Sequence, residues 1–164
     1  MNSRSAASIA ARLTAAVALG TTIVLGASGC TFLTHQATTI EYPASDGVNV
    51  DATGGPVVVR NALIIATDDG SAGNLVAAFV NEGDETASVS IDVEGRRFTV
   101  RVPAKDAVSL GADEDPLLIE GLGVEPGATV EMLFRSGGEE ADPVSVPVLD
   151  ASLPSYADLA PDAE

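Results

Sequence analysis

The strongest structural signal in this sequence is the stretch ASVSIDVEGRRFTVRV, residues 87–102. Apolar and polar residues alternate over 87–93 and again over 97–102, which is the pattern of strands with one buried face. In the second run the side chains expected to point outward are Arg97, Thr99 and Arg101. Glu94 and Gly95 separate the two runs, so the stretch predicts a β-hairpin closed by a tight turn.

Further short apolar runs lie on both sides of this hairpin, and turn residues such as Gly54-Gly55-Pro56 and Glu125-Pro126-Gly127 separate them. Val48 and Val50 are expected to pair at an edge, and Pro147 marks the last run as a second edge strand. The remaining strands are expected over residues 38–42, 57–65, 74–80, 107–110, 117–119, 129–134 and 144–148.

No segment after residue 38 shows the period of an amphipathic helix. About eight short strands at regular spacing predict an all-β fold, an antiparallel sandwich of immunoglobulin-like or cupredoxin-like type. Phe79, Phe98 and Phe134 are expected to be the large core residues, and Leu117, Leu118 and Ile119 a short buried strand.

The N-terminus has the order of an export signal. Arg4 and Arg12 precede an apolar run over 13–25, which small residues and Cys30 follow. The run is shorter than the roughly 20 apolar residues of a membrane span. The segment Ala27-Ser28-Gly29-Cys30 resembles the lipobox of bacterial lipoproteins, with Ala27 where that box prefers Leu. The resemblance implies cleavage between Gly29 and Cys30, and acylation (palmitate) of Cys30.

Two alternatives to a lipoprotein remain: a secretory signal followed by an unpaired thiol, and a retained, uncleaved anchor. The lipoprotein interpretation divides the chain into a signal peptide (1–29), an acylated tether with a first edge segment (30–56), the β-sandwich (57–149) and a disordered acidic tail (150–164). It places the protein on the extracytoplasmic face of the cell membrane, held there through the acyl chains on Cys30.

Charge limits the partners of the chain after residue 29. This part has six basic and 24 acidic residues, so its net charge is −18. Such a surface repels nucleic acids and anionic lipid headgroups. We therefore expect no nucleic-acid partner, and a membrane contact made by acyl chains alone. Weak cation binding at the acidic turns 68–70 and 113–115, including calcium binding through oxygen ligands, is an open alternative.

Residues 57–149 resemble the periplasmic copper-chaperone β-sandwich family, and more closely the lipoproteins of high-GC Gram-positive bacteria that share this fold. The resemblance rests on three segments, LVAAFVNEGD (75–84), LLIEGL (117–122) and EPGATV (125–130). It implies the fold, and a copper site built from histidine and methionine. The positions that match the family's His-x-Met pair are Pro116 and Leu118, which have no copper-binding side chain. Met132, in an alternating run, and His35, on the tether, are the remaining soft ligands after residue 29.

Catalytic groups are scarce as well. A catalytic triad or a zinc site would need histidine or cysteine in the domain. Acid–base catalysis would need a positioned titratable group. The sequence shows neither, and no phosphate-binding loop. We therefore expect a non-enzymatic binding or structural lipoprotein without cofactor or metal, with an envelope protein as its partner. The alternative is a metal-handling envelope protein descended from a copper chaperone.

Overall fold

The computed structural model describes residues 45–161, and this part of the chain is nearly all β. The predicted hairpin is present as β4 and β5, joined at Glu94 and Gly95. The strands are β1 (Val48–Val50), β2 (Val57–Ala66), β3 (Ala72–Asn81), β4 (Ala87–Val93), β5 (Arg96–Val102), β6 (Ala107–Leu110), β7 (Leu117–Glu120), β8 (Thr129–Arg135) and β9 (Val144–Leu149).

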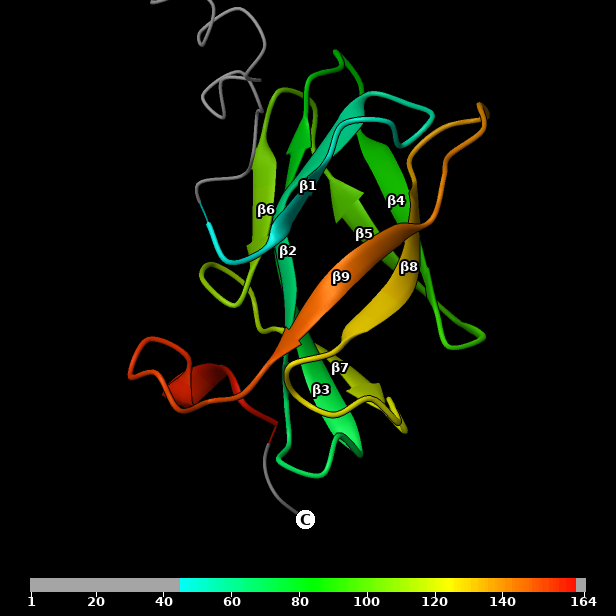
Figure 1. The fold of residues 1–164 in the computed structure, drawn as a ribbon. Coiled ribbons are helices and arrows are strands. Elements are labelled where there is room, and N and C mark those ends of the chain that lie inside the picture. The colour runs from blue at the N-terminus through cyan, green and yellow to red at the C-terminus, as the bar shows by residue number, and fades with distance from the viewer. Residues whose placement is uncertain (1–44, 162–164) are drawn as a thin grey trace, which may run out of the picture. The chain divides into compact units, whose positions relative to one another are not determined.

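The nine strands form one mixed sheet, with the order β5-β4-β8-β9-β2-β3-β6. Strand β1 pairs with β2, as expected for Val48 and Val50, and β7 pairs with β3 beside β6. Figure 1 shows how the sheet curls until it is nearly closed into a barrel. The all-β class is confirmed, but the antiparallel sandwich is wrong in detail. The pair β2–β9 is parallel, at Ile64 with Val148 and Ile65 with Leu149.

Strand β9 is the reason for this difference. It pairs antiparallel with β8 and then continues along β2, so it joins what would be the two sheets of a sandwich (Figure 1). The prediction that Pro147 marks an edge strand is therefore wrong. Val148 exchanges backbone hydrogen bonds with Gly127 and Ala128. Neighbouring residues of a strand point their N–H groups to opposite sides, so the nitrogen of Pro147 faces away from β8 and no bond of that ladder is lost.

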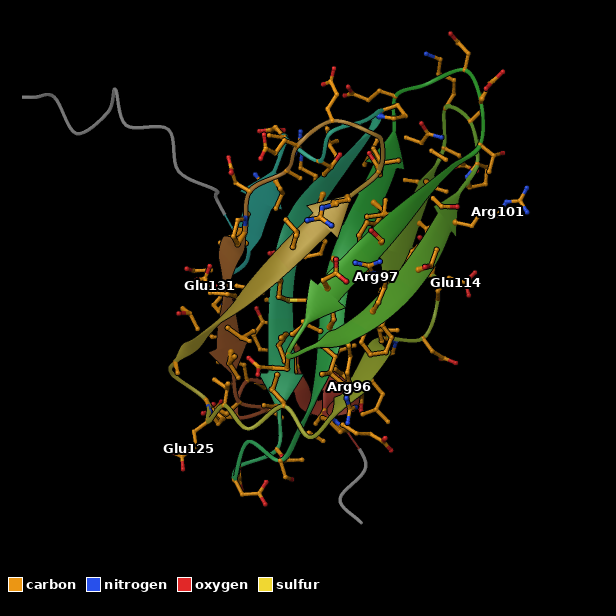
Figure 2. The ribbon with its side chains drawn as sticks, turned by 90° about the vertical axis from the view of Figure 1, so that its right-hand side faces the viewer. Arg96, Arg97, Arg101, Glu114, Glu125 and Glu131 are labelled. Atoms are coloured by element: carbon orange, nitrogen blue, oxygen red, sulfur yellow. The ribbon has the colours of Figure 1, made fainter. Side chains whose placement is uncertain are left out.

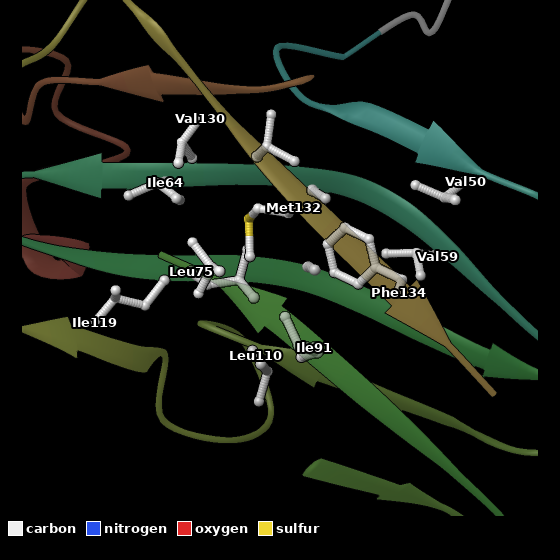
Figure 3. Close-up of a cluster of buried hydrophobic side chains, with 14 of the residues drawn as sticks. Val50, Val59, Ile64, Leu75, Ile91, Leu110, Ile119, Val130, Met132 and Phe134 are labelled. Atoms are coloured by element: carbon white, nitrogen blue, oxygen red, sulfur yellow. The ribbon is translucent and has the colours of Figure 1, made fainter. Parts of the chain in front are cut away.

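The interior of the barrel is apolar. Figure 3 shows Met132 and Phe134 of β8 pointing into the same interior as Leu75 and Val59. Phe79 and Phe134 are fully buried, and their ring centroids lie 6.3 Å apart. Two core predictions need correction. Phe98 is only half-buried, because β5 is a terminal strand of the sheet. In β7 only Ile119 is buried, while Leu118 is 46% exposed.

The C-terminal segment also differs from expectation. Residues 150–164 were expected to be a disordered tail, but as far as residue 161 the chain has a described path that includes the 3₁₀ helix η2 (Ala157–Leu159). Asn74 of β3 donates a hydrogen bond from Nδ2 to the carbonyl of Leu159 at 3.0 Å, and the Tyr156 hydroxyl donates to the Asp46 carboxylate. These hydrogen bonds hold a segment whose larger apolar side chains are only partly covered, since Leu153 is 52% exposed and Leu159 is half-buried.

The predicted signal, the cleavage site at Gly29 and Cys30, and the strand over 38–42 lie outside the described residues. Within residues 45–161 no helix is long and apolar enough to cross a membrane.

Candidate binding surface

The positions that align with copper ligands in the sequence do not form a group of soft donor side chains in the described structure. Pro116 precedes β7 and is half-buried, and Leu118 is exposed on β7. Met132 lies in the core with 1% of its surface exposed, and His35 lies outside the described residues. Among residues 45–161 no three histidine, cysteine, aspartate or glutamate side chains are grouped to hold a metal ion.

The acidic turn at 68–70 uses its central carboxylate to close itself. Oδ1 of Asp69 accepts hydrogen bonds from the Thr67 hydroxyl at 2.8 Å and from the backbone N–H of Ser71 at 3.0 Å. These bonds, first of all those from Ser71, lower the pKa of Asp69 to about 2. A cavity of about 770 Å³ lies beside this turn, bounded also by Leu118 and Glu120 of β7.

A second cavity, of about 410 Å³, lies under the C-terminal segment beside Asp46 and Tyr156. The hydrogen bond to the Asp46 carboxylate, together with burial and the negative charge, raises the pKa of Tyr156. This pair attaches the C-terminal segment to the start of the described chain. It therefore has a structural role that the sequence did not suggest.

The surface with the most distinctive chemistry is the outer face of the three neighbouring strands β5, β4 and β8, which Figure 2 shows with Arg97 near its middle. We call this the arginine face: Arg97 and Arg101 on β5, Asp92 on β4 and Arg135 on β8. The register brings these side chains to one side of the sheet, because Asp92 pairs with Arg97 on one side and with Leu133, two residues before Arg135, on the other.

Asp92 lies between two arginines. Arg97 donates two hydrogen bonds to its carboxylate, from Nε to Oδ1 at 2.6 Å and from Nη2 to Oδ2 at 3.0 Å. Nη1 of Arg135, on the neighbouring strand, lies 3.8 Å from the same Oδ2. The hydrogen bond from Arg97 is the main cause that lowers the pKa of Asp92, and the pair raises the pKa of Arg97. Arg101 has no carboxylate within 4.0 Å among the described residues, so its guanidinium is available to a ligand.

Charge is strongly segregated in this protein. Strands β5, β4 and β8 contain four of the six basic residues that follow residue 29, and only two of the 24 acids, Asp92 and Glu131. These strands therefore have a net charge of +2 in a chain whose net charge after residue 29 is −18. Their outer face alone, which also includes Glu131, has three arginines and two acids and a net charge of +1. Arg96 is the fourth of these basic residues, and its guanidinium reaches Gly121 at the end of β7 instead of the arginine face.

The sequence showed part of this surface. Alternation placed Arg97, Thr99 and Arg101 on the outward side of β5, and the structure confirms all three as exposed. The participation of Arg135 was missed, because it depends on β8 pairing with β4, two strands about 40 residues apart. Counting basic residues per predicted strand would have pointed to β5 alone, because Arg135 lies just beyond the strand predicted over residues 129–134.

No family model matches this chain, and no curated protein sequence matches it. Among solved structures it is similar to the copper-bound PCuAC domain from PmoF2, with a TM-score of 0.48 and 14% identity over 62% of this chain and 97% of that chain. It is also similar to the apo PCuAC domain from PmoF1, with a TM-score of 0.46 and 19% identity over 61% and 98% of the two chains. Similarity at this level does not assign an activity.

Proposed function

We propose that this protein is a lipid-anchored extracytoplasmic binding protein without catalytic activity, and that its arginine face contacts another envelope protein. The observation that carries the proposal is the exposed, positively charged face of β5, β4 and β8 in a strongly acidic chain. Exposed charge of one sign on such a background attracts partners of opposite charge and speeds their encounter.

The anchor is a separate part of this proposal, and it rests on the N-terminal sequence. Changing Cys30→Ser removes the thiol that would be acylated. We expect the wild-type protein in the membrane fraction with an acyl-modified Cys30 as its first residue. A mature N-terminus at an unmodified residue other than Cys30, found by mass spectrometry, would overturn the anchor.

The partner contact is tested by site-specific crosslinking in intact cells. A photoreactive residue replaces Ser88, which is exposed on the outer face of β4, and in a matched control it replaces Ser152, which is exposed on the C-terminal segment. We expect a discrete covalent adduct with an envelope protein from position 88 and none from position 152. Identical adducts from both positions, or none from position 88, would refute the proposed contact.

The alternative, metal handling, is supported by the resemblance of residues 57–149 to the copper-chaperone family. We place it second because the described residues contain no histidine or cysteine, and their single methionine, Met132, is buried. Titration of the full-length protein with Cu(I) and with Ca²⁺ separates the two functions. We expect no tight binding of either ion, and stoichiometric uptake below micromolar concentration would establish the alternative.

A further inference from the structure

One side of β5 has no hydrogen-bonded strand, although β6, the other end of the sheet order, approaches it where the barrel nearly closes. The strand pairs with β4 and is the end of the sheet order. Its turn has two residues, Glu94 and Gly95, both with positive φ (45° and 73°), which is the geometry of a type I′ hairpin. In such a turn the flanking residues Val93 and Arg96 form a hydrogen-bonded pair.

The direction of every backbone group in β5 follows from that turn. Hydrogen-bonded and non-hydrogen-bonded pairs alternate along an antiparallel ladder, so Phe98 and Val100 bond to β4, as Arg96 does. The N–H and C=O groups of Arg97, Thr99 and Arg101 therefore point away from β4, toward the open edge. Within residues 45–161 none of these three residues has a backbone hydrogen bond to another segment.

The side chains beside this open edge are of two kinds. Arg97 and Arg101 are exposed on the outer face, with Thr99 between them, while Phe98 and Val100 are half-buried on the opposite side. Every second side chain of a strand placed along this edge would lie on the outer face, beside the guanidinium groups. The side chains between them would lie on the opposite face, beside the apolar surface.

We propose that β5 binds an extended segment of another polypeptide, in which acidic side chains alternate with apolar ones, as an added strand of the sheet. This inference rests on the proposed binding function and specifies its partner. Backbone hydrogen bonds to Arg97, Thr99 and Arg101 would hold the segment, and its carboxylates would pair with Arg97 and Arg101, as Asp92 already pairs with Arg97.

The same features disfavour two other occupants. Charged residues on an edge strand oppose pairing with a like-charged copy, and a second β5 would place arginines beside arginines. An anionic bilayer would attract the arginine face, but the net charge of −18 of the chain after residue 29 would repel the same bilayer. A bilayer would also leave the open backbone groups of β5 without hydrogen bonds.

The test measures binding of two fluorescein-labelled peptides to the full-length protein in a non-ionic detergent. One is Val-Glu-Val-Glu-Val-Glu-Val. The other, Val-Val-Val-Val-Glu-Glu-Glu, has the same composition and charge in blocks. Fluorescence anisotropy should show that the alternating peptide binds at least about tenfold more tightly, because only its pattern matches both faces of β5. Equal affinity for the two peptides, or no binding of the alternating one, would overturn the proposal.

Two pairs of variants separate the backbone contribution from the charge contribution. Thr99→Pro removes an N–H that faces the open edge and leaves the β4 ladder intact, whereas Thr99→Ala keeps that N–H. We expect Thr99→Pro to weaken binding of the alternating peptide by about tenfold or more, and Thr99→Ala to change it by less than about twofold.

Arg101→Glu should weaken binding by about two- to thirtyfold, because an attraction across strands becomes a repulsion. The matched control Arg60→Glu makes the same change of charge on β2, four strands away in the sheet order, and should have no effect beyond about twofold. Because Arg101→Glu leaves the backbone unchanged, it keeps the test decisive if Thr99→Pro does not fold.

The remaining outcomes identify other occupants. Displacement of the alternating peptide by phosphatidylglycerol vesicles but not by phosphatidylcholine vesicles would make the arginine face a lipid contact. Dimerisation without peptide in sedimentation, lost in Thr99→Pro, would make the occupant a second copy. An adduct from position 88 in cells that persists in Thr99→Pro would keep the proposed envelope contact and overturn strand addition alone.

Discussion

The side chain of Asn81 makes the most informative stability prediction. It is 1% exposed at the end of β3. Its Nδ2 donates to the carbonyls of Glu85, Val102 and Pro103 at 2.8, 3.1 and 3.0 Å, and its Oδ1 accepts from the N–H of Gly83 at 2.9 Å. One amide therefore joins the β3–β4 turn to the end of β5.

The size of the effect follows from the bonds of this amide, whose two Nδ2 hydrogens are shared among three carbonyl oxygens and whose Oδ1 accepts one further bond. A typical intramolecular hydrogen bond contributes about 0.5–1.5 kcal/mol, and a buried group left without a partner costs about 1–3 kcal/mol. Asn81→Ala should therefore reduce the free energy of unfolding by about 3–5 kcal/mol, a large part of the roughly 5–15 kcal/mol of a typical domain. The matched control Asn74→Ala loses the single side-chain bond to Leu159 and should cost about 1 kcal/mol.

Urea unfolding of the full-length protein, followed by far-UV circular dichroism, measures both values. Circular dichroism is suitable because the chain has no tryptophan. A loss below about 1 kcal/mol for Asn81→Ala, or an equal loss for Asn74→Ala, would refute the reasoning from bond number and burial.

Asn81→Asp adds a pH dependence to the same test. It keeps the acceptor for Gly83 but directs a carboxylate at three carbonyl oxygens, so burial and these dipoles should raise its pKa above the unfolded value of about 3.9. The folded state then binds the proton more tightly than the unfolded state. The stability of the variant should therefore fall as pH rises from about 4 to 8. A flat pH profile relative to wild type would contradict this.

Three further predictions concern β4, β5 and the core, each measured by the same unfolding assay. Phe134→Ala should cost about 3–5 kcal/mol, and Phe98→Ala distinctly less, because Phe134 is fully buried and Phe98 is half-exposed; equal costs would contradict the burial. Glu94→Asn should stabilise by about 0.5 kcal/mol, since Asn tolerates the positive φ of 45° better than Glu; a loss would contradict this. Asp92→Asn should cost no more than about 1 kcal/mol, because its pair with Arg97 lies at the surface. Since the folded pKa of Asp92 is lowered, this contribution is present above the unfolded pKa and is lost as pH falls through the folded value. A cost of Asp92→Asn that is as large below the folded pKa as at neutral pH would contradict it.

The sequence by itself determined the features that depend on neighbouring residues. Period-two alternation and the Glu94-Gly95 turn defined the hairpin and the outward side of Arg97, Thr99 and Arg101, because alternation of side chains is a property of each strand alone. The alternating run that contains Met132 is likewise a strand, and Met132 lies on its buried side.

Only the tertiary structure decided which strands meet. The parallel pairing of β9 with β2 places Val148 beside Ile64, and the arginine face needs β8 beside β4. Neither pairing can be predicted from the sequence pattern, because the alternation of side chains along a strand is the same whichever strand lies beside it. The half-exposure of Phe98 and the exposure of Leu118 likewise follow from their places at the margins of the sheet. Residue pattern fixes which way a side chain points, but its burial and its partners depend on what the remainder of the chain places against it.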